Sequence, residues 1–402
     1  MKILPYKNLF IGITETLNHI FFEQKYADRE LQKTLKSNPK WGSKDRAFIA
    51  ETVYDTIRWK RMIEASMGKE IAADNLWEFV GTWFALNDEK LPYWDEFKKV
   101  NQKDILKRNH AATESSFAVK ASIPDWLHEL GKSELGNQWE TEIDVMNVPS
   151  PTVIRVNTLK TDRKTLQKKL KEEGFESEIL SKYPDALQMA DKSNVFKSEA
   201  FKNGWFEIQD AGSQLISPYL NVEPGMRVVD ACAGAGGKTL HLAALMENKG
   251  QIYALDIHEW KLLELKKRAK RNGAQNIQNK IIESSKTIKK MENTADRLLI
   301  DAPCSGLGVL SRNPDAKWKL SLEFIEKIKQ EQQKILNDYC KIVKPGGAMV
   351  YATCSILPSE NQHQVQGFLV QHPEFKLMRE KQLLPSQTGF DGFYMAYLEK
   401  IS

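Results

Sequence analysis

Residues 227–239 read RVVDACAGAGGKT, an apolar run that ends in an acidic residue and passes into a glycine-rich turn. A strand, such a turn and a following helix are typical of nucleotide-binding α/β folds. Apolar runs of strand length then alternate with helical patterns as far as AMVYATC (348–354). This alternation predicts a doubly wound, parallel sheet of the Rossmann type, whose ligand crevice lies at the carboxyl ends of the strands.

The glycine-rich turn fits neither of the common phosphate-binding loops. A Walker loop needs glycine where Cys232 stands, and a dinucleotide fingerprint that starts at Gly234 needs Gly or Ala where Thr239 stands. Asp256 ends the next predicted strand, where a carboxylate can accept hydrogen bonds from ribose hydroxyls. The pattern favours a nucleoside without phosphates, such as S-adenosylmethionine (SAM). A Rossmann turn without a ligand is the alternative.

The four cysteines of the chain all lie in its second half, and no C-x-x-C motif is present. We therefore expect neither a structural metal site nor a disulfide framework. Cys304 and Cys354 each end a predicted strand, as does Asp301, so all three should face the ligand crevice. Cys340 lies on a predicted helix and is expected to pack in the core. Cys232 lies in the glycine-rich turn, where we expect only a small side chain to be needed and the thiol to have no chemical role.

Several blocks of sequence carry a family resemblance. DACAGAGGKT (230–239), DAPCSGLGVLSRNPDAKW (301–318) and YATCSILPSEN (351–361) resemble signature blocks of the RsmB/Nop2/Sun family of RNA cytosine-C5 methyltransferases. Three further blocks resemble that family over the same region: RVNTLK (155–160), IQDAGSQL (208–215) and DGFYMAYLEK (391–400). The resemblance therefore covers about residues 150–402.

The resemblance implies a mechanism with two cysteines. Cytosine C5 is a weak nucleophile, and addition of a thiolate to C6 activates it toward a methyl donor. By resemblance, Cys354 is the nucleophile and Cys304 assists release of the methylated product. Asp301 is expected to hydrogen-bond the base and to favour a protonated N3. Lys238 is a candidate positive neighbour of the Cys354 thiolate. Alternatively, it caps its helix or pairs with an acid at the end of the sheet.

The resemblance also implies how SAM is held. The turn that would bind its methionine and ribose ends consists of Cys232, Ala233, Gly234, Ala235, Gly236, Gly237 and Lys238. Asp256 would bind the ribose hydroxyls, and Asp301 would lie beside the cofactor. Glu283 is the candidate for the acidic residue that the family carries near the adenine. Gly234-Ala235 stands where many members have Ala-Pro, which removes no functional group, so we expect SAM binding to survive. No metal is expected.

Residues 1–148 are predicted to form a helical domain plus linker. WGSKDRAFIAETVYDTIRWKR (41–61) resembles the NusB-like RNA-binding domain of the RsmB branch, and residues 45–67 show helical spacing. Two prolines near residue 150 mark a boundary. Residues 149–210 then read as a small α+β, RRM-like subdomain, and residues 211–402 as the Rossmann-like methyltransferase domain.

RNA is the expected partner. Lys plus Arg (58) exceeds Asp plus Glu (53) by five, so any RNA surface should be local. The basic segments 160–171 and 261–271 could contact phosphates, or could be solvated helix faces. By resemblance, Arg155, Asn157 and Arg312 line the substrate side. The target cytosine must be unpaired or flipped out, because a stacked base cannot reach both a thiol and a cofactor.

Several classes of protein are disfavoured. No run approaches the roughly 18 apolar residues of a membrane span, and we read no signal peptide, so a cytoplasmic monomer is expected. A DNA cytosine methyltransferase would not need Cys354, and Glu360-Asn361-Gln362 follows the wrong cysteine for its partner motif. The favoured function is SAM-dependent methylation of cytosine C5 in RNA, with ribosomal RNA preferred by analogy with the NusB-like segment. A tRNA methyltransferase and a non-catalytic RNA-binding factor for ribosome assembly are the alternatives.

Overall fold

The computed structural model describes residues 6–191 and 194–401, and the chain divides into two compact units. The first unit, here called the helical unit, comprises Met1–Asn147 together with Leu310–Leu322. The second comprises Val148–Val309 and Glu323–Ser402 and contains both β-sheets. None of the helices in the described residues is long and apolar enough to cross a membrane.

The helical unit is built around a stripe of apolar residues in its third helix. Its helices are α1 (Lys7–Phe22), α2 (Ala27–Ser37), α3 (Ser43–Arg58), α4 (Lys60–Met67), α5 (Leu76–Leu86), α6 (Gln102–Ser115), α7 (Phe117–Lys120), α8 (Asp125–Leu135) and α9 (Gln138–Met146). Ile49, Val53 and Ile57 recur every four residues in α3 and are fully buried in its core. Helical spacing predicted one helix over 45–67, but the structure breaks it at Trp59. Ser122 Oγ then accepts a hydrogen bond from the Arg61 N–H (3.0 Å) in the first turn of α4.

The segment that follows the predicted Cys304 turn belongs to the helical unit. Lys317, in α17 (Ala316–Lys319), is 1% exposed, and its Nζ donates to the carbonyl of Arg58 (2.8 Å) and to Asn147 Oδ1 (3.1 Å). Trp318 Nε1 donates to the carbonyl of Ile57 (2.7 Å). The sequence predicted one continuous domain over 211–402 and did not indicate that residues 310–322 belong to the helical unit. Arg312, predicted to line the substrate side, lies in this segment and is partly exposed.

A small antiparallel sheet opens the second unit. Its strands are β1 (Val153–Val156), β2 (Ser177–Ile179), β3 (Ala186–Met189) and β4 (Phe206–Ile208), in the order β2-β3-β1-β4. Helix α10 (Arg163–Glu172) packs Leu166 and Leu170 against it, in a cluster with Ile154 and Phe206. These elements form the α+β arrangement that the sequence predicts for this region.

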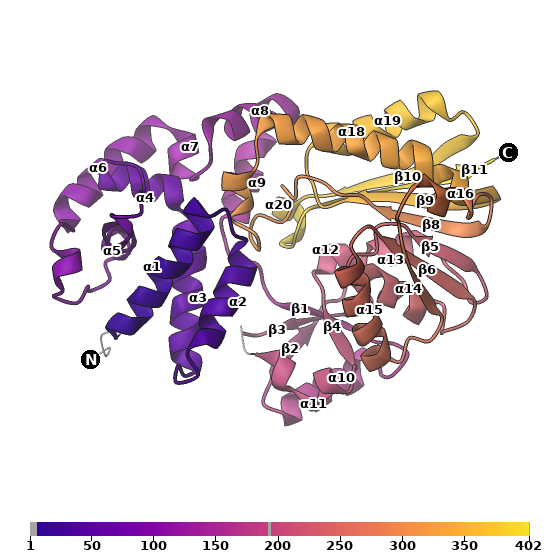
Figure 1. Ribbon diagram of the computed structural model, residues 1–402, viewed down its shortest axis with the longest axis horizontal. Coiled ribbons are helices and arrows are strands. Elements are labelled where there is room, and N and C mark those ends of the chain that lie inside the picture. Colours follow the sequence, from indigo (N-terminus) through magenta and orange to yellow (C-terminus); the bar gives the residue numbers. More distant parts are fainter. Residues whose placement is uncertain (1–5, 192–193, 402) are drawn as a thin grey trace. The chain divides into compact units, whose positions relative to one another are not determined.

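The larger sheet has seven strands in the order β10-β11-β9-β8-β5-β6-β7 (Figure 1). Five strands are parallel to one another: β5 (Arg227–Asp230), β6 (Gln251–Asp256), β7 (Ile277–Ile281), β8 (Ala295–Asp301) and β9 (Val343–Thr353). The last two, β10 (Phe375–Leu383) and β11 (Phe393–Lys400), pair antiparallel. The predicted Rossmann-like fold is confirmed, with an antiparallel edge added to the parallel sheet.

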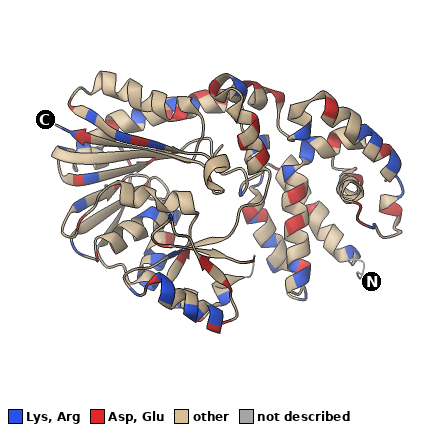
Figure 2. Cartoon of the chain, turned by 180° about the vertical axis from the view of Figure 1, so that it is seen from behind, with Lys and Arg blue, Asp and Glu red and all other residues tan. Residues whose placement is uncertain are grey.

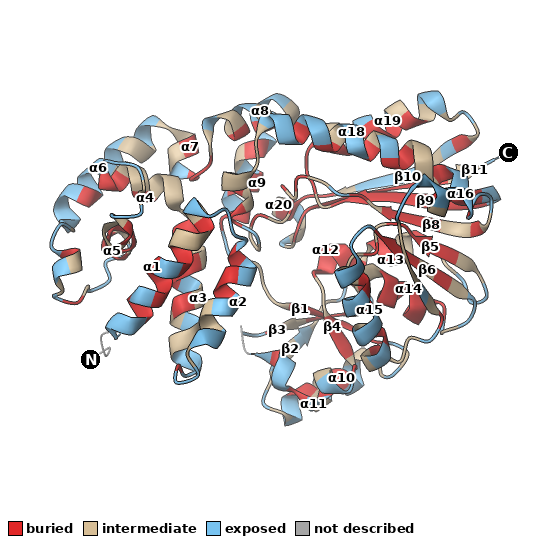
Figure 3. Cartoon of the chain, in the orientation of Figure 1, coloured by how far each residue is buried: buried red, intermediate tan, exposed pale blue. Residues whose placement is uncertain are grey.

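Helices cover both faces of this sheet because its strand residues alternate between two cores. In β8, Leu298 and Ile300 belong to one core and Leu299 to the other. Helices α18 (Leu322–Tyr339) and α19 (Gln362–Gln371) cover the first face. Helices α13 (Ile216–Tyr219) and α14 (Gly237–Leu245) cover the second, and α15 (Glu259–Asn272) follows β6. Figure 3 shows the inner strands of this sheet mostly buried and the outer helix faces exposed.

Candidate active site

The glycine-rich turn joins β5 to α14 and is fixed by its neighbours. Asp256, at the end of β6, accepts a hydrogen bond from the Gly234 N–H (2.9 Å) at one carboxylate oxygen and from the His258 N–H (2.8 Å) at the other. Gly234 and Gly236 have φ values of +55° and +89°. A Cβ at Gly236 would lie 2.5 Å from Leu265 Cγ, so only glycine fits this position.

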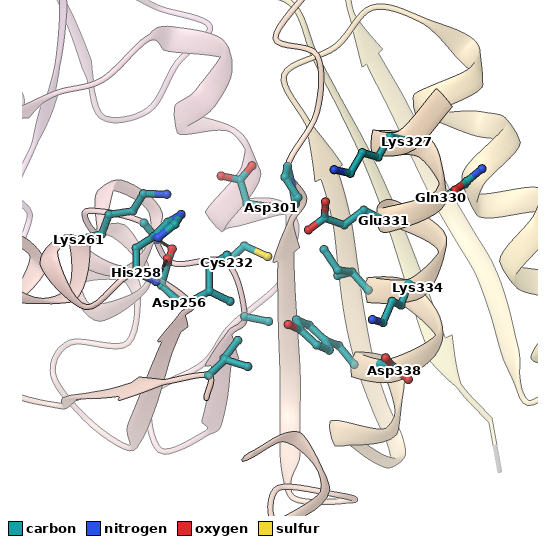
Figure 4. A pocket seen from close by; sticks show the side chains of 17 residues that line it. Cys232, Asp256, His258, Lys261, Asp301, Lys327, Gln330, Glu331, Lys334 and Asp338 are labelled. Atoms are coloured by element: carbon teal, nitrogen blue, oxygen red, sulfur yellow. Dashed lines mark hydrogen bonds between the residues drawn. The ribbon is translucent and has the colours of Figure 1, made fainter. Parts of the chain in front are cut away.

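A cavity of about 710 Å³ opens beside this turn (Figure 4). Cys232, Gly234, Asp256 and Asp301 line it, as the sequence predicts for a cofactor site. Its volume suits a nucleoside with an amino-acid tail, and Asp256 presents carboxylate oxygens where ribose hydroxyls would bind. The residues present therefore fit SAM. Within the described part of the chain, no group of three or more His, Cys, Asp or Glu residues could hold a metal ion.

The other residues of the turn shape it rather than line the cavity. Ala233 is buried, and its N–H donates to the carbonyl of Leu255 (2.8 Å). The carbonyl of Ala235 accepts from Arg268 Nη1 (2.6 Å), and that of Gly237 accepts from Arg155 Nη1 (2.6 Å). Burial raises the pKa of the Cys232 thiol well above its ordinary value, so this sulfur stays protonated.

The prediction for Glu283 is wrong. Its side chain is exposed and does not line the cavity, whereas the neighbouring Ile282 does. The Ile282 N–H donates to the carbonyl of Asp256 (3.0 Å), and this bond fixes which residue after β7 faces the cofactor site. An apolar side chain, not a carboxylate, therefore lies at this point of the cavity wall.

Sequence reasoning missed half of the cavity wall. Ile257, His258 and Lys261 line it from the start of α15. Helix α18 faces them across the cavity (Figure 4) and contributes Lys327, Gln330, Glu331, Lys334 and Asp338. These five polar residues recur at helical spacing of three and four, which is the signal that could have marked this face of α18.

Lys238 and Asp301 form a tight ion pair at the edge of the cavity. Lys238 Nζ lies 2.6 Å from Asp301 Oδ2, which matches the alternative that Lys238 pairs with an acid at the end of the sheet. Burial lowers the pKa of the Lys238 ammonium, but the adjacent Asp301 carboxylate outweighs it and the pKa lies above its ordinary value. The thiolate form of Cys354 acts in the same direction. Lys238 is therefore a permanent cation beside the Cys354 thiol at neutral pH.

The two predicted catalytic thiols lie close together at the carboxyl ends of β8 and β9. Cys304 follows β8, Cys354 follows β9, and their Sγ atoms are 3.2 Å apart as free thiols. The hydrogen bond with Cys354 is the largest cause that raises the pKa of the Cys304 thiol, followed by burial and by the charges of Cys354 and Glu360. The arrangement therefore keeps the Cys304 thiol protonated at neutral pH.

Arg155 and Asn157, predicted to face RNA, lie in the interior. They are 2% and 4% exposed. Asn157 Nδ2 donates to the carbonyls of Gly204 (2.7 Å) and Asn272 (2.8 Å), and Arg155 Nη1 also binds Gln209 Oε1. These bonds join the small sheet to α14 and α15, so the prediction of direct RNA contact is wrong for both residues.

The basic segment 261–271 is only partly available to RNA. Arg268 (2.9 Å) and Arg271 both bind the buried Glu207 carboxylate of β4. The exposed cations of α15 are Lys266, Lys267 and Lys270. Helix α10 carries a further group of Lys and Arg residues, visible in Figure 2. Exposed cations that RNA could contact thus lie on α10 and on the outer face of α15.

Comparison with known proteins places this site in a family. Residues 217–399 match the family described as 16S rRNA methyltransferase RsmB/F, and residues 123–196 match the ferredoxin-like domain of RsmF/B-like methyltransferases. The probable ribosomal RNA small subunit methyltransferase B of Synechocystis sp. is 34% identical over 306 residues, 71% of this chain and 68% of that protein. Ribosomal RNA small subunit methyltransferase B of Vibrio vulnificus is 36% identical over 292 residues, 70% of this chain and 68% of that protein.

Two solved structures are similar. "Crystal Structure of PH0851" has a TM-score of 0.85 and 27% identity, covering 99% of this chain and all of that one. A methyltransferase homolog protein from Pyrococcus horikoshii has a TM-score of 0.63 and 27% identity, covering 71% of this chain and 97% of the other. The first similarity extends over the helical unit as well as both sheets, so the whole fold has a solved counterpart.

Proposed function

Because this chain belongs to the RsmB/F family of SAM-dependent RNA methyltransferases, we propose that it methylates C5 of a cytosine in the RNA of the small ribosomal subunit. The pair of thiols 3.2 Å apart is the observation that carries the proposal. Methylation of a nitrogen or a hydroxyl needs no sulfur nucleophile. Methylation of C5 needs one thiolate to activate the ring, and a second thiol beside it is suited to assist its departure.

The proposed reaction uses four side chains. Cys354 Sγ adds to C6 of the cytosine, and C5 becomes nucleophilic. Asp301 hydrogen-bonds the ring and stabilises the protonated N3 of the adduct. Lys238, 2.6 Å from Asp301, holds that carboxylate in place and supplies a positive charge to the site. After methylation C5 loses its proton, the C5–C6 double bond re-forms, and the bond to Cys354 breaks with its electron pair returning to sulfur. Cys304 assists this last step.

SAM supplies the methyl group as a sulfonium that a carbon nucleophile can attack. Cys232, Gly234 and Asp256 would hold it along the turn and β6, with Asp301 beside it. Ile257 and Ile282 would form apolar walls for its adenosine. The remaining members of the turn, Ala233, Ala235, Gly236 and Gly237, give the backbone the shape that brings these groups together.

The RNA is expected to contact the exposed cations of α10 and α15 and the helical, NusB-like unit. This organisation into a helical part, an RRM-like part and a methyltransferase part supports a folded RNA target, and Arg312 remains a candidate contact to that RNA. Ribosomal RNA is favoured because the relatives are named for it. An enzyme with this substrate acts in the cytoplasm, and we expect it to do so as a monomer.

Transfer to defined RNAs tests the substrate. The protein is incubated with methyl-labelled SAM and, separately, small-subunit RNA, assembled small subunits and tRNA from unmodified cells, and the RNA is digested to nucleosides. We expect label in 5-methylcytidine from the small-subunit samples. Label in tRNA alone would assign the other substrate. Binding of SAM and RNA without transfer to any cytosine would favour a non-catalytic role in ribosome assembly.

A further inference from the structure

Glu360 is a buried carboxylate that the proposed reaction does not use. It ends the short 3-10 helix Pro358–Glu360 just before α19 and has no solvent exposure. Its side chain accepts four hydrogen bonds: from Ser305 Oγ (2.5 Å), Ser355 Oγ (2.5 Å), the Ser305 N–H (2.8 Å) and Gln332 Nε2 (3.0 Å). All four donors are uncharged groups. Burying a carboxylate costs free energy unless hydrogen bonds satisfy it, so the loss of these bonds would destabilise this part of the fold.

Three of the four donors come from the two turns that carry the reactive thiols. Ser305 directly follows Cys304, and Ser355 directly follows Cys354. One carboxylate therefore ties both turns together at the point where the sulfur atoms lie 3.2 Å apart. Gln332, from α18, also donates to the carbonyl of Pro303 (3.0 Å), the residue before Cys304. The Cys304 turn is thus held on both sides of its thiol: Glu360 binds Ser305, and Gln332, which also donates to Glu360, binds Pro303.

The Cys354 turn has a side-chain support that does not involve Glu360, whereas the side-chain bonds at Pro303 and Ser305 come from Gln332 and Glu360, which are bonded to each other. Asn361 Oδ1 accepts from Thr353 Oγ1 (2.5 Å), and Asn361 Nδ2 donates to the carbonyl of Ser355 (2.9 Å). These two contacts hold the residues on either side of Cys354 independently of Glu360. Loss of the Glu360 carboxylate would therefore displace Cys304 more than Cys354.

We propose that Glu360 is a positioning residue that locks the Cys304 turn against the Cys354 turn for the release step. This inference rests on the proposed two-cysteine function and deepens it. Charge adds to geometry, because the Glu360 carboxylate helps to raise the pKa of the Cys304 thiol after the larger effects of Cys354 and burial. A role in packing alone would not require hydrogen bonds between this carboxylate and both cysteine turns.

Glu360→Gln tests the proposal, because an amide places a donor where the carboxylate accepted. We expect kcat to fall about 10- to 100-fold, as a misplaced catalytic group costs, while KM for SAM changes less than about threefold. Attack by Cys354 persists, so the covalent protein–RNA adduct should accumulate. Asn361→Ala is the matched variant at the next position: it frees the Cys354 turn, so kcat should fall without any accumulation of adduct.

Two controls separate positioning from loss of stability. Glu207→Gln removes a buried carboxylate of the same unit, at the β4–α15 contact, and should lower the melting temperature without accumulating adduct. Ser355→Ala leaves three of the four bonds to Glu360, so it should fold and accumulate adduct to a smaller extent. This variant decides the question if Glu360→Gln does not fold.

The outcomes distinguish this inference from the proposed function. If the wild type makes 5-methylcytidine and Glu360→Gln retains full kcat, or loses SAM binding without any excess of adduct, the positioning role is overturned and the function stands. If the wild type forms neither 5-methylcytidine nor adduct, the proposed function fails first. A shift of the rate–pH profile for Cys304 alkylation toward lower pH in Glu360→Gln would support the role, and a merely structural carboxylate would leave that profile unchanged.

Discussion

At the scale of single residues, the site depends on carboxylates held in unequal environments. Asp256 and Asp301 line the cofactor cavity, whereas Asp230 is buried at the end of β5 and accepts a hydrogen bond from Thr239 Oγ1 (2.7 Å). Burial raises the pKa of Asp230 to about 7. This carboxyl is therefore neutral in mildly acidic solution and becomes charged in the interior above neutrality.

The contribution of Asp230 to the stability of the protein should consequently fall as the pH rises from about 4 to 7. In this range the unfolded chain has released the Asp230 proton while the folded chain retains it, so proton loss favours unfolding. Asp230→Asn keeps an acceptor for Thr239 and removes the titration. Between pH 5 and pH 8 the variant should gain about 1–3 kcal/mol relative to wild type, measured by urea unfolding. An equal difference in unfolding free energy at both pH values would contradict the burial of this group.

At the same scale of single residues, the sequence could not predict the orientation of every side chain. Cys304, Cys354, Asp301, Lys238 and Asp256 could be placed in one site because strand ends of a parallel sheet meet at one edge. Glu283, Arg155 and Asn157 could not, because a motif gives positions along the chain but not which way each side chain turns. Arg155 and Asn157 satisfy carbonyl groups inside the fold, a role that charge and motif do not reveal.

At the scale of elements, the β5–α14 turn depends on one glycine. Gly236 needs a positive φ and touches Leu265, whereas the next residue, Gly237, is helical and has open space around its Cα. Gly236→Ala should cost about 1–3 kcal/mol of stability and weaken SAM binding. Gly237→Ala should be neutral or slightly stabilising. Isothermal titration with SAM compares the two, and equal affinities would show that the turn is not the cofactor site.

Helices and strands with a clear periodicity of apolar residues could be predicted from the sequence. The residues at which these elements begin and end could be predicted less well. Strands β5, β6, β8 and β9 stand out as apolar runs between helices, and the structure contains all of them. Helix α18 ends at Tyr339, and residues 340–342 form a 3-10 turn. Strand β9 then begins at Val343, five residues before the apolar run AMVYATC (348–354) that the sequence marks as a strand. At the start of β9, pairing with β8 and β11 overrides the local preference of these residues for a turn.

At the scale of the whole molecule, one excursion of the chain links its two units covalently. Residues 310–322 leave the methyltransferase sequence just after the Cys304 turn and complete the core of the helical unit. Lys317 is buried there, and burial is the main cause that lowers its pKa well below the ordinary value. No periodicity in this segment indicates its partner, which is why the sequence did not predict it.

A chain that starts at residue 148 should therefore not fold cleanly. Without the helical residues, Lys317 loses its acceptors at Arg58 and Asn147, and Trp318 loses its contact with Ile57. We expect rapid proteolysis within 310–322 and a low or broad melting transition, with the full chain as the control. A truncated protein that binds SAM with unchanged affinity and resists proteolysis in this segment would contradict the account.

The central claim is that Cys354 attacks the base and Cys304 serves release, and trapping of the adduct tests it most directly. Wild type, Cys304→Ala and Cys354→Ala are each incubated with SAM and small-subunit RNA, and denaturing gels report protein bound covalently to RNA. We predict adduct with Cys304→Ala, none with Cys354→Ala, and little with wild type because release is complete. Adduct formed by Cys354→Ala, or methyl transfer by that variant at the wild-type rate, would contradict the assignment.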